Sequence, residues 1–109
     1  MSNIVKLVVF APLPDADKVR QALGDAGAGK IGNYTFCTFS QKGYGRFLPN
    51  EDANPTIGKS GRFEQVEEEK IETLCEQSKL KEVIKAIKEV HPYEEVAFDI
   101  IPLLAESDI

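Results

Sequence analysis

The sequence predicts an α+β fold, with a four-stranded antiparallel sheet and two helices on one of its faces. Three observations support this prediction. Apolar residues recur at helical spacing over about 15–26 and 78–90, and β-branched or aromatic segments flank both stretches. A Gly- and Pro-rich stretch, residues 41–62, separates the two halves. The resulting order, β-α-β-loop-β-α-β, is the split βαβ pattern of ferredoxin-like folds.

Length and composition are those of a single globular domain over residues 1–109. The chain has 109 residues, of which 42% are hydrophobic and 28% charged. A domain of this size buries roughly 65% of the surface that its unfolded chain exposes. We therefore expect a hydrophobic core that needs no disulfide or structural metal.

Charge and hydropathy argue against two classes of partner. The net charge of −5 disfavours nucleic acid, because phosphate binding depends on lysine and arginine. No apolar run approaches the roughly 18 residues of a membrane span, and the N-terminal segment is interpreted as a strand, not a signal peptide. The two cysteines are too few for a disulfide scaffold. A cytoplasmic location is expected.

The first half of the chain is predicted to form a strand and a helix. Asn3–Phe10 is rich in β-branched residues, with both faces covered, and Pro12 and Pro14 end it. The helix extends from about Asp15 to Ala26, and Gly27 follows as a C-terminal stop. Its apolar positions are Ala16, Val19, Ala22, Leu23 and Ala26.

The second strand is predicted over Asn33–Ser40. Tyr34 and Phe36 alternate there with Cys37 and Phe39, which places aromatic or apolar side chains on both faces. Cys37 is interpreted as a small core residue. With both sheet faces partly apolar, we expect a homo-oligomer, with a trimer as the first hypothesis.

The second half is predicted to repeat the pattern after the long loop. Residues 62–75 form a third strand in which Val66 and Ile71 fall on opposite faces, which indicates a bulge or a strongly polar face. Cys75, near its end, is expected to be the more exposed cysteine. Ser78 is a candidate helix cap, and Glu95–Leu104 is the last strand.

The stretch AGAGKIGNY contains Gly27-x-Gly29-x-x-Gly32, the spacing of a dinucleotide-binding loop. That loop requires a strand before the glycines and a helix after them, so that the helix N-terminus faces the pyrophosphate. Here a helix precedes the glycines and a strand follows. The motif is therefore interpreted as a turn.

The long loop carries a second glycine motif, ANPTIGKS. It ends like a phosphate-binding loop, but Ala53 replaces the first glycine and the segment lies between two strands, which excludes a Walker-type site. Backbone amides and cations there can still hold a small anion. The alternative is a solvated, mobile loop. The candidate ligand-binding residues in this loop are Gly58, Lys59, Ser60, Gly61 and Arg62.

The stretch HPYEE lies where the second helix gives way to the last strand. His91, Glu94 and Glu95 supply nitrogen and oxygen ligands suited to a divalent metal, the possible cofactor. A carboxylate beside the imidazole would also suit an acid–base role. In the purely structural alternative His91 caps the helix, Tyr93 packs and the glutamates face water. Tyr93 is also a candidate ligand contact.

Three segments together resemble a known family: GAGKIGNYTFCTFSQKGYGRFLP, ANPTIGKSGRFEQVEEEKIE and HPYEEVAFDIIPLL. They are similar to the inserted domain of Nif-three-like proteins, the NGG-interacting-factor or GTP-cyclohydrolase-type-2-like family, here as a stand-alone domain. The resemblance implies the trimeric ferredoxin-like fold of PII and CutA proteins. In PII-like relatives the loop corresponding to residues 41–62 contacts partner proteins or nucleotides at subunit clefts.

The resemblance does not carry over the family's dinuclear metal site, which lies on two flanking halves with several histidines, whereas this chain has one. The first hypothesis is a non-catalytic binding module that holds a small ligand or divalent cation near subunit clefts. The alternatives are a metal-assisted hydrolase using His91 with Glu94 or Glu95, and a structural domain that docks proteins through the loop.

Overall fold

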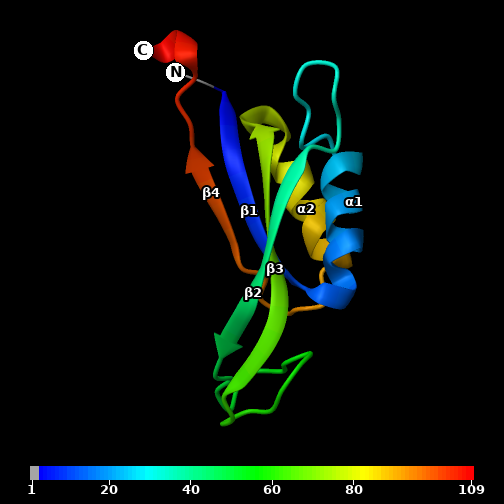
Figure 1. The fold of residues 1–109 in the computed structure, drawn as a ribbon. Coiled ribbons are helices and arrows are strands. Elements are labelled where there is room, and N and C mark those ends of the chain that lie inside the picture. Colours follow the sequence, from blue (N-terminus) through cyan, green and yellow to red (C-terminus); the bar gives the residue numbers. More distant parts are fainter. Residues whose placement is uncertain (1–2) are drawn as a thin grey trace.

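The computed structural model describes residues 3–109 and has the predicted order of elements. Four strands form one antiparallel sheet in the order β2-β3-β1-β4, and both helices lie on one of its faces (Figure 1). The ferredoxin-like prediction is confirmed. The elements are β1 (Ile4–Pro12), α1 (Ala16–Asp25), β2 (Thr38–Phe47), β3 (Glu64–Glu76), α2 (Leu80–Val90) and β4 (Phe98–Pro102).

The core lies between the sheet and the helices. Strand β1 runs through the middle of the sheet, and Val5, Leu7 and Val9 are buried along it at every second position. Their partners in β3 are Cys75, Thr73 and Ile71, which are buried as well. Helix residues complete the core: Ala16, Val19, Leu23, Val83 and Ile87. Each large apolar side chain buried in this way contributes about 1.5–3 kcal/mol.

The first helix ends at the glycine that the sequence predicts. Gly27 has a φ of 101°, and its amide donates to the carbonyl of Gly24 at 3.0 Å, while the amide of Ala28 donates to that of Leu23 at 3.0 Å. These bonds satisfy carbonyls that the end of a helix leaves free. The glycine motif is a turn between a helix and a strand, as expected.

The second strand begins later than predicted, at Thr38. Residues 33–37 form turns, so Tyr34 and Phe36 do not lie on the sheet. The segment after α1 is attached near the C-terminal end of β3, because the Gly29 amide donates to the Leu74 carbonyl at 2.7 Å. Phe36 has a φ of 59°, and its ring packs on Gly24 in α1. The alternation of aromatic and apolar residues in this segment predicted a strand and did not indicate the turn in the backbone.

Both cysteine predictions were wrong. Cys37 lies just before β2 and is half-buried, so it is not a core residue of a strand. Cys75 is buried, because it pairs with Val5 on the helix-covered face of the sheet. The two thiols are free.

Strands β2 and β3 extend beyond the helical layer as a long hairpin (Figure 1). β2 continues to Phe47, so the loop that follows covers residues 48–63, not 41–62. Within the extension, Lys42 lies opposite Glu69, and opposite charges at facing positions across strands are favourable. The register is continuous, without the bulge that Val66 and Ile71 had suggested. The molecule measures 49 × 25 × 23 Å.

The last strand and the second helix also differ in detail from the predictions. β4 covers Phe98–Pro102, within the predicted Glu95–Leu104. A 3₁₀ turn over Gln77–Lys79 precedes α2, and Ser78 makes no capping hydrogen bond. Neither helix in residues 3–109 is long and apolar enough to cross a bilayer.

Candidate functional site

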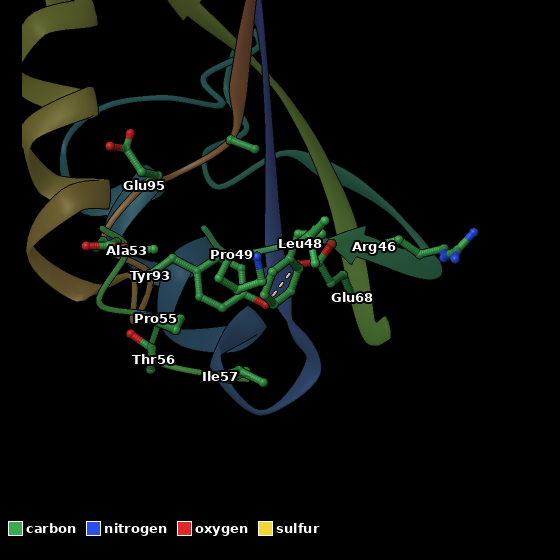
Figure 2. Close-up of a pocket in the computed structure, with 14 residues that line it drawn as sticks. Arg46, Leu48, Pro49, Ala53, Pro55, Thr56, Ile57, Glu68, Tyr93 and Glu95 are labelled. Atoms are coloured by element: carbon green, nitrogen blue, oxygen red, sulfur yellow. Dashed lines mark hydrogen bonds between the residues drawn. The ribbon is translucent and has the colours of Figure 1, made fainter. Parts of the chain in front are cut away.

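A pocket of about 310 Å³ lies at the base of the long hairpin, beside the point where β1 ends. It is lined by the end of β2 (residues 45–47), by parts of the segment 48–57, by Glu68 of β3 and by residues within 93–97 (Figure 2). Most of the lining side chains are apolar. The volume lies at the lower end of the roughly 300–1,000 Å³ typical of small-molecule sites.

The HPYEE turn is held in place by its histidine. The Tyr93 amide donates to His91 Nδ1 at 3.2 Å, so Nδ1 is an acceptor and Nε2 carries the proton. Nε2 then donates to the carbonyl of Phe10, at 2.7 Å, near the end of β1. His91 is only 7% exposed. It therefore fixes the turn against the middle strand of the sheet.

This geometry does not suit a metal site on His91 within one chain. Both ring nitrogens are engaged in hydrogen bonds, and a cation would need one of them free. Across residues 3–109, no group of three His, Cys, Asp or Glu side chains is placed to hold an ion. Glu94 and Glu95 lie together on the exposed turn beyond His91.

Tyr93 forms one wall of the pocket. Its hydroxyl donates to Glu68 Oε2 at 3.0 Å (Figure 2). Burial, together with the neighbouring Glu68 carboxylate, raises the pKa of Tyr93 well above its usual range, because the anionic form is disfavoured. The Tyr93 ring also lies 6.3 Å from that of Phe47, at an interplanar angle of 58°.

The opposite wall is a part of the loop that is attached to the HPYEE turn. The Asn54 amide donates to Glu94 Oε1 at 2.9 Å, and the Thr56 hydroxyl donates to the Pro92 carbonyl. These bonds join residues about 40 positions apart in the sequence. This part of the loop is therefore tied to the body of the protein and closes one side of the pocket.

The other predicted ligand residues lie further along the same loop. Of the six candidates, all within the described residues, Tyr93 lines the pocket and Gly58–Arg62 do not. Residues 58–62 form a compact turn in which the Gly61 amide donates to the Pro49 carbonyl at 2.7 Å. Lys59 and Arg62 are exposed there.

Sequence reasoning did not identify Phe47 and Glu68 as site residues. Phe47 was assigned to the long loop, and Glu68 to the third strand, for which the sequence predicted a bulge or a strongly polar face. Their proximity to Tyr93 depends on the length of the β2–β3 hairpin and on the register of β3 against β1, which pairs Glu68 with Pro12 where β1 ends. The charge pattern is a weak signal for the β2–β3 register, because Lys42 opposite Glu69 is the only pair of opposite charges between these two strands.

Similarity to solved structures defines the class of the domain. CutA from Archaeoglobus fulgidus superposes with a TM-score of 0.67 at 19% identity, covering 92% of this chain and 83% of that one. CutA1 from Shewanella sp. SIB1 gives 0.70 at 15% identity, covering 94% and 83%. At sequence identities of 19% and 15%, the similarity to these two proteins shows a shared fold and no more. The domain has the CutA-type ferredoxin-like fold.

Sequence similarity goes further than the fold. The chain is 52% identical over 106 residues to a GTP cyclohydrolase 1 type 2 homolog of Halalkalibacterium halodurans, and 49% identical over 98 residues to that of Bacillus subtilis. A Bacillus cereus protein related to NIF3 is 52% identical, with a TM-score of 0.80 over 92% of this chain and 25% of that one. No family model matches the chain.

The two matches cover 97% and 90% of this chain, but 28% of the H. halodurans protein and 26% of the B. subtilis protein. The chain thus spans about a quarter of the length of the curated relatives that it matches. It is related, over nearly its whole length, to one domain-sized part of the NIF3-related GTP cyclohydrolase 1 type 2 homologs. The resemblance inferred from the three sequence motifs is confirmed.

Proposed function

We propose that this domain is a binding module of the PII/CutA type that holds a small organic ligand in the Tyr93 pocket. The observation that carries the proposal is the pocket itself, about 310 Å³ and bounded by four separate chain segments. Two of its walls are fixed by hydrogen bonds, from Tyr93 to Glu68 and from Asn54 to Glu94. A preformed apolar hollow with a few placed polar groups is the usual form of a small-molecule site.

An organic ligand suits the geometry better than a divalent cation on His91. The imidazole is 7% exposed and has a hydrogen-bond partner at each nitrogen. The hydrolase alternative depends on the same imidazole together with Glu94 or Glu95, and Oε1 of Glu94 already accepts the Asn54 amide. We therefore propose a structural role for His91, as the residue that positions Tyr93.

Assembly as a homotrimer remains part of the proposal. Large apolar side chains are exposed on both edge strands, among them Phe39 and Tyr44 on β2 and Ile101 on β4. Contact between copies would remove this surface from water. Light scattering coupled to gel filtration gives the mass directly, and a monomeric mass at micromolar concentration would contradict the trimer.

A thermal-shift screen tests the binding proposal. Ligands at 100 times their dissociation constant stabilise a native protein by about 2.7 kcal/mol, which is visible as a higher melting temperature. We expect hits among small organic compounds, and we expect Ala53→Phe to abolish them by filling the pocket that Ala53 lines. The matched control is Ala105→Phe, on the tail after β4 and outside the pocket.

A screen without hits would contradict the proposal, and so would either of two further outcomes. Hits that persist in Ala53→Phe would place binding elsewhere on the domain. Stabilisation by divalent metals that is lost in His91→Gln, a variant of similar polarity, would favour the metal site over an organic ligand.

A further inference from the structure

The pocket contains an aromatic corner. Phe47, the last residue of β2, and Tyr93 meet there with ring centroids 6.3 Å apart and an interplanar angle of 58°. Both residues line the pocket and are half-buried. Two tilted rings beside a cavity offer negative π faces to a ligand, and a desolvated cation is the group that gains most from them.

The polar lining of the pocket is mostly negative. Glu68, Glu94 and Glu95 line the pocket, and among residues 3–109 none of the three forms an ion pair with a lysine or arginine. Elsewhere in the same strand, Glu69 and Glu72 each have a basic partner. Over residues 3–109, the carboxylates of the pocket therefore lack the basic partners that Glu69 and Glu72 have.

The one basic residue in the lining does not offset this charge. Arg46 precedes Phe47 on β2, so its side chain leaves the strand on the opposite face. Figure 2 shows its guanidinium pointing away from Tyr93 and the other labelled side chains. An anionic ligand would thus meet carboxylates with no cation directed toward it.

We propose that the pocket selects an organic cation of the ammonium type with a small apolar body. The apolar walls and the two rings would hold the body and the charged group, and the Glu68 carboxylate would lie close to the positive charge. This inference rests on the proposed function and adds the charge class of the ligand. Residues 58–62, which include Lys59 and Arg62, lie outside the pocket, so they do not add positive charge to its lining.

Three probes of one shape isolate the effect of charge: choline, its neutral isostere 3,3-dimethylbutan-1-ol, and the anion 3,3-dimethylbutanoate. Titration of the full chain, followed by amide NMR shifts at residues 45–57 and 93–97, gives an affinity for each probe. We expect choline to bind about tenfold more tightly than the neutral isostere, because only the cation gains a cation–π contact with the rings and attraction to the Glu68 carboxylate. The anion should bind most weakly.

Variants in β3 identify the carboxylate responsible. Glu68→Gln keeps the shape and can still accept the Tyr93 hydroxyl, so we expect it to reduce choline affinity severalfold while leaving that of the neutral isostere unchanged. Glu67→Gln is the matched control, because Glu67 is the next residue of β3, is exposed and lies outside the pocket. It should bind all three probes like the unmodified chain.

The result that overturns the inference differs from the result that overturns the proposed function. If the neutral or anionic probe binds at these amides as tightly as choline does, the cation preference is wrong and the pocket remains a ligand site. If none of the three probes binds, the cation preference is wrong. A blank thermal-shift screen, by contrast, contradicts the proposed function itself.

Discussion

At the scale of single residues, burial determines how reactive the two cysteine thiols are, and the spacing of residues along the chain does not predict that burial. Cys75 lies in the core, and burial, with the nearby Glu76 carboxylate, raises the pKa of its thiol. Cys37, which the sequence places in the core, lies outside the sheet at the start of β2. The thiolate is the reactive form of cysteine, so the two thiols should differ in reactivity.

We therefore expect a maleimide or Ellman's reagent to modify Cys37 well before Cys75 in the folded protein. Mass spectrometry after timed labelling measures both sites, and Cys37→Ser should leave a slowly reacting thiol. Under denaturing conditions Cys75 should react at an ordinary rate. Fast labelling of Cys75 in the native protein would contradict its burial.

The raised pKa of the Tyr93 hydroxyl makes the free energy of unfolding depend on pH in the alkaline range. Because the folded-state pKa lies above the unfolded value of about 10, the stabilisation is complete below pH 10 and is lost as pH rises toward the folded pKa. Above pH 10 the free energy of unfolding should fall by up to about 1.4 kcal/mol per pH unit from this group. Tyr93→Phe should lack that part of the decline.

Urea unfolding at pH 9 and pH 11 measures the effect. Tyr34→Phe is the control, because Tyr34 is 74% exposed and should follow the unmodified chain. If Tyr93→Phe loses as much stability as the unmodified chain between the two pH values, folding does not raise the pKa of Tyr93.

At the scale of elements, helix α1 contains Gly24, at a position where the Phe36 ring leaves no room for a side chain. A Cβ atom on Gly24 would lie 1.9 Å from Cδ1 of the Phe36 ring. Alanine is a better helix former than glycine by about 1 kcal/mol, but displacing a packed ring costs about 1–3 kcal/mol. We expect Gly24→Ala to be destabilising by about 1 kcal/mol.

A double-mutant cycle separates the two effects. In a Phe36→Ala background the ring is absent, so Gly24→Ala should become neutral or stabilising. Thermal or urea unfolding of the four proteins measures the coupling. An equal effect of Gly24→Ala in both backgrounds would show that the ring does not rest on this glycine.

Local patterns predicted the elements whose burial has a clear period. The stripes of α1 and α2, the strand β1 and the glycine stop after α1 were all found from spacing, because each depends on neighbours within a few residues. The start of β2 was misplaced by about five residues. Its position depends on the hydrogen bond from Gly29 to Leu74, which joins segments far apart in the sequence.

At the scale of the whole molecule, the candidate site is a product of tertiary structure. The HPYEE motif singled out Tyr93, which lines the candidate pocket, but its partners Phe47 and Glu68 lie on a hairpin whose length the sequence did not reveal. The polar segment of β2 still forms a strand, because it pairs with β3 without interruption from Thr38 to Phe47. The family resemblance predicted the fold and pointed to residues 41–62, part of which lines the pocket, but it did not indicate that these residues meet Glu68 and Tyr93.

The central claim is that a ligand binds between the hairpin base and the HPYEE turn. The measurement that tests it most directly is amide NMR mapping of a hit from the thermal-shift screen on the isotope-labelled chain. The account predicts shifts at Phe47, Thr56, Tyr93 and Ala97, which disappear in Ala53→Phe. Shifts centred instead on the second, smaller hollow of about 150 Å³ beside Lys30 would contradict it.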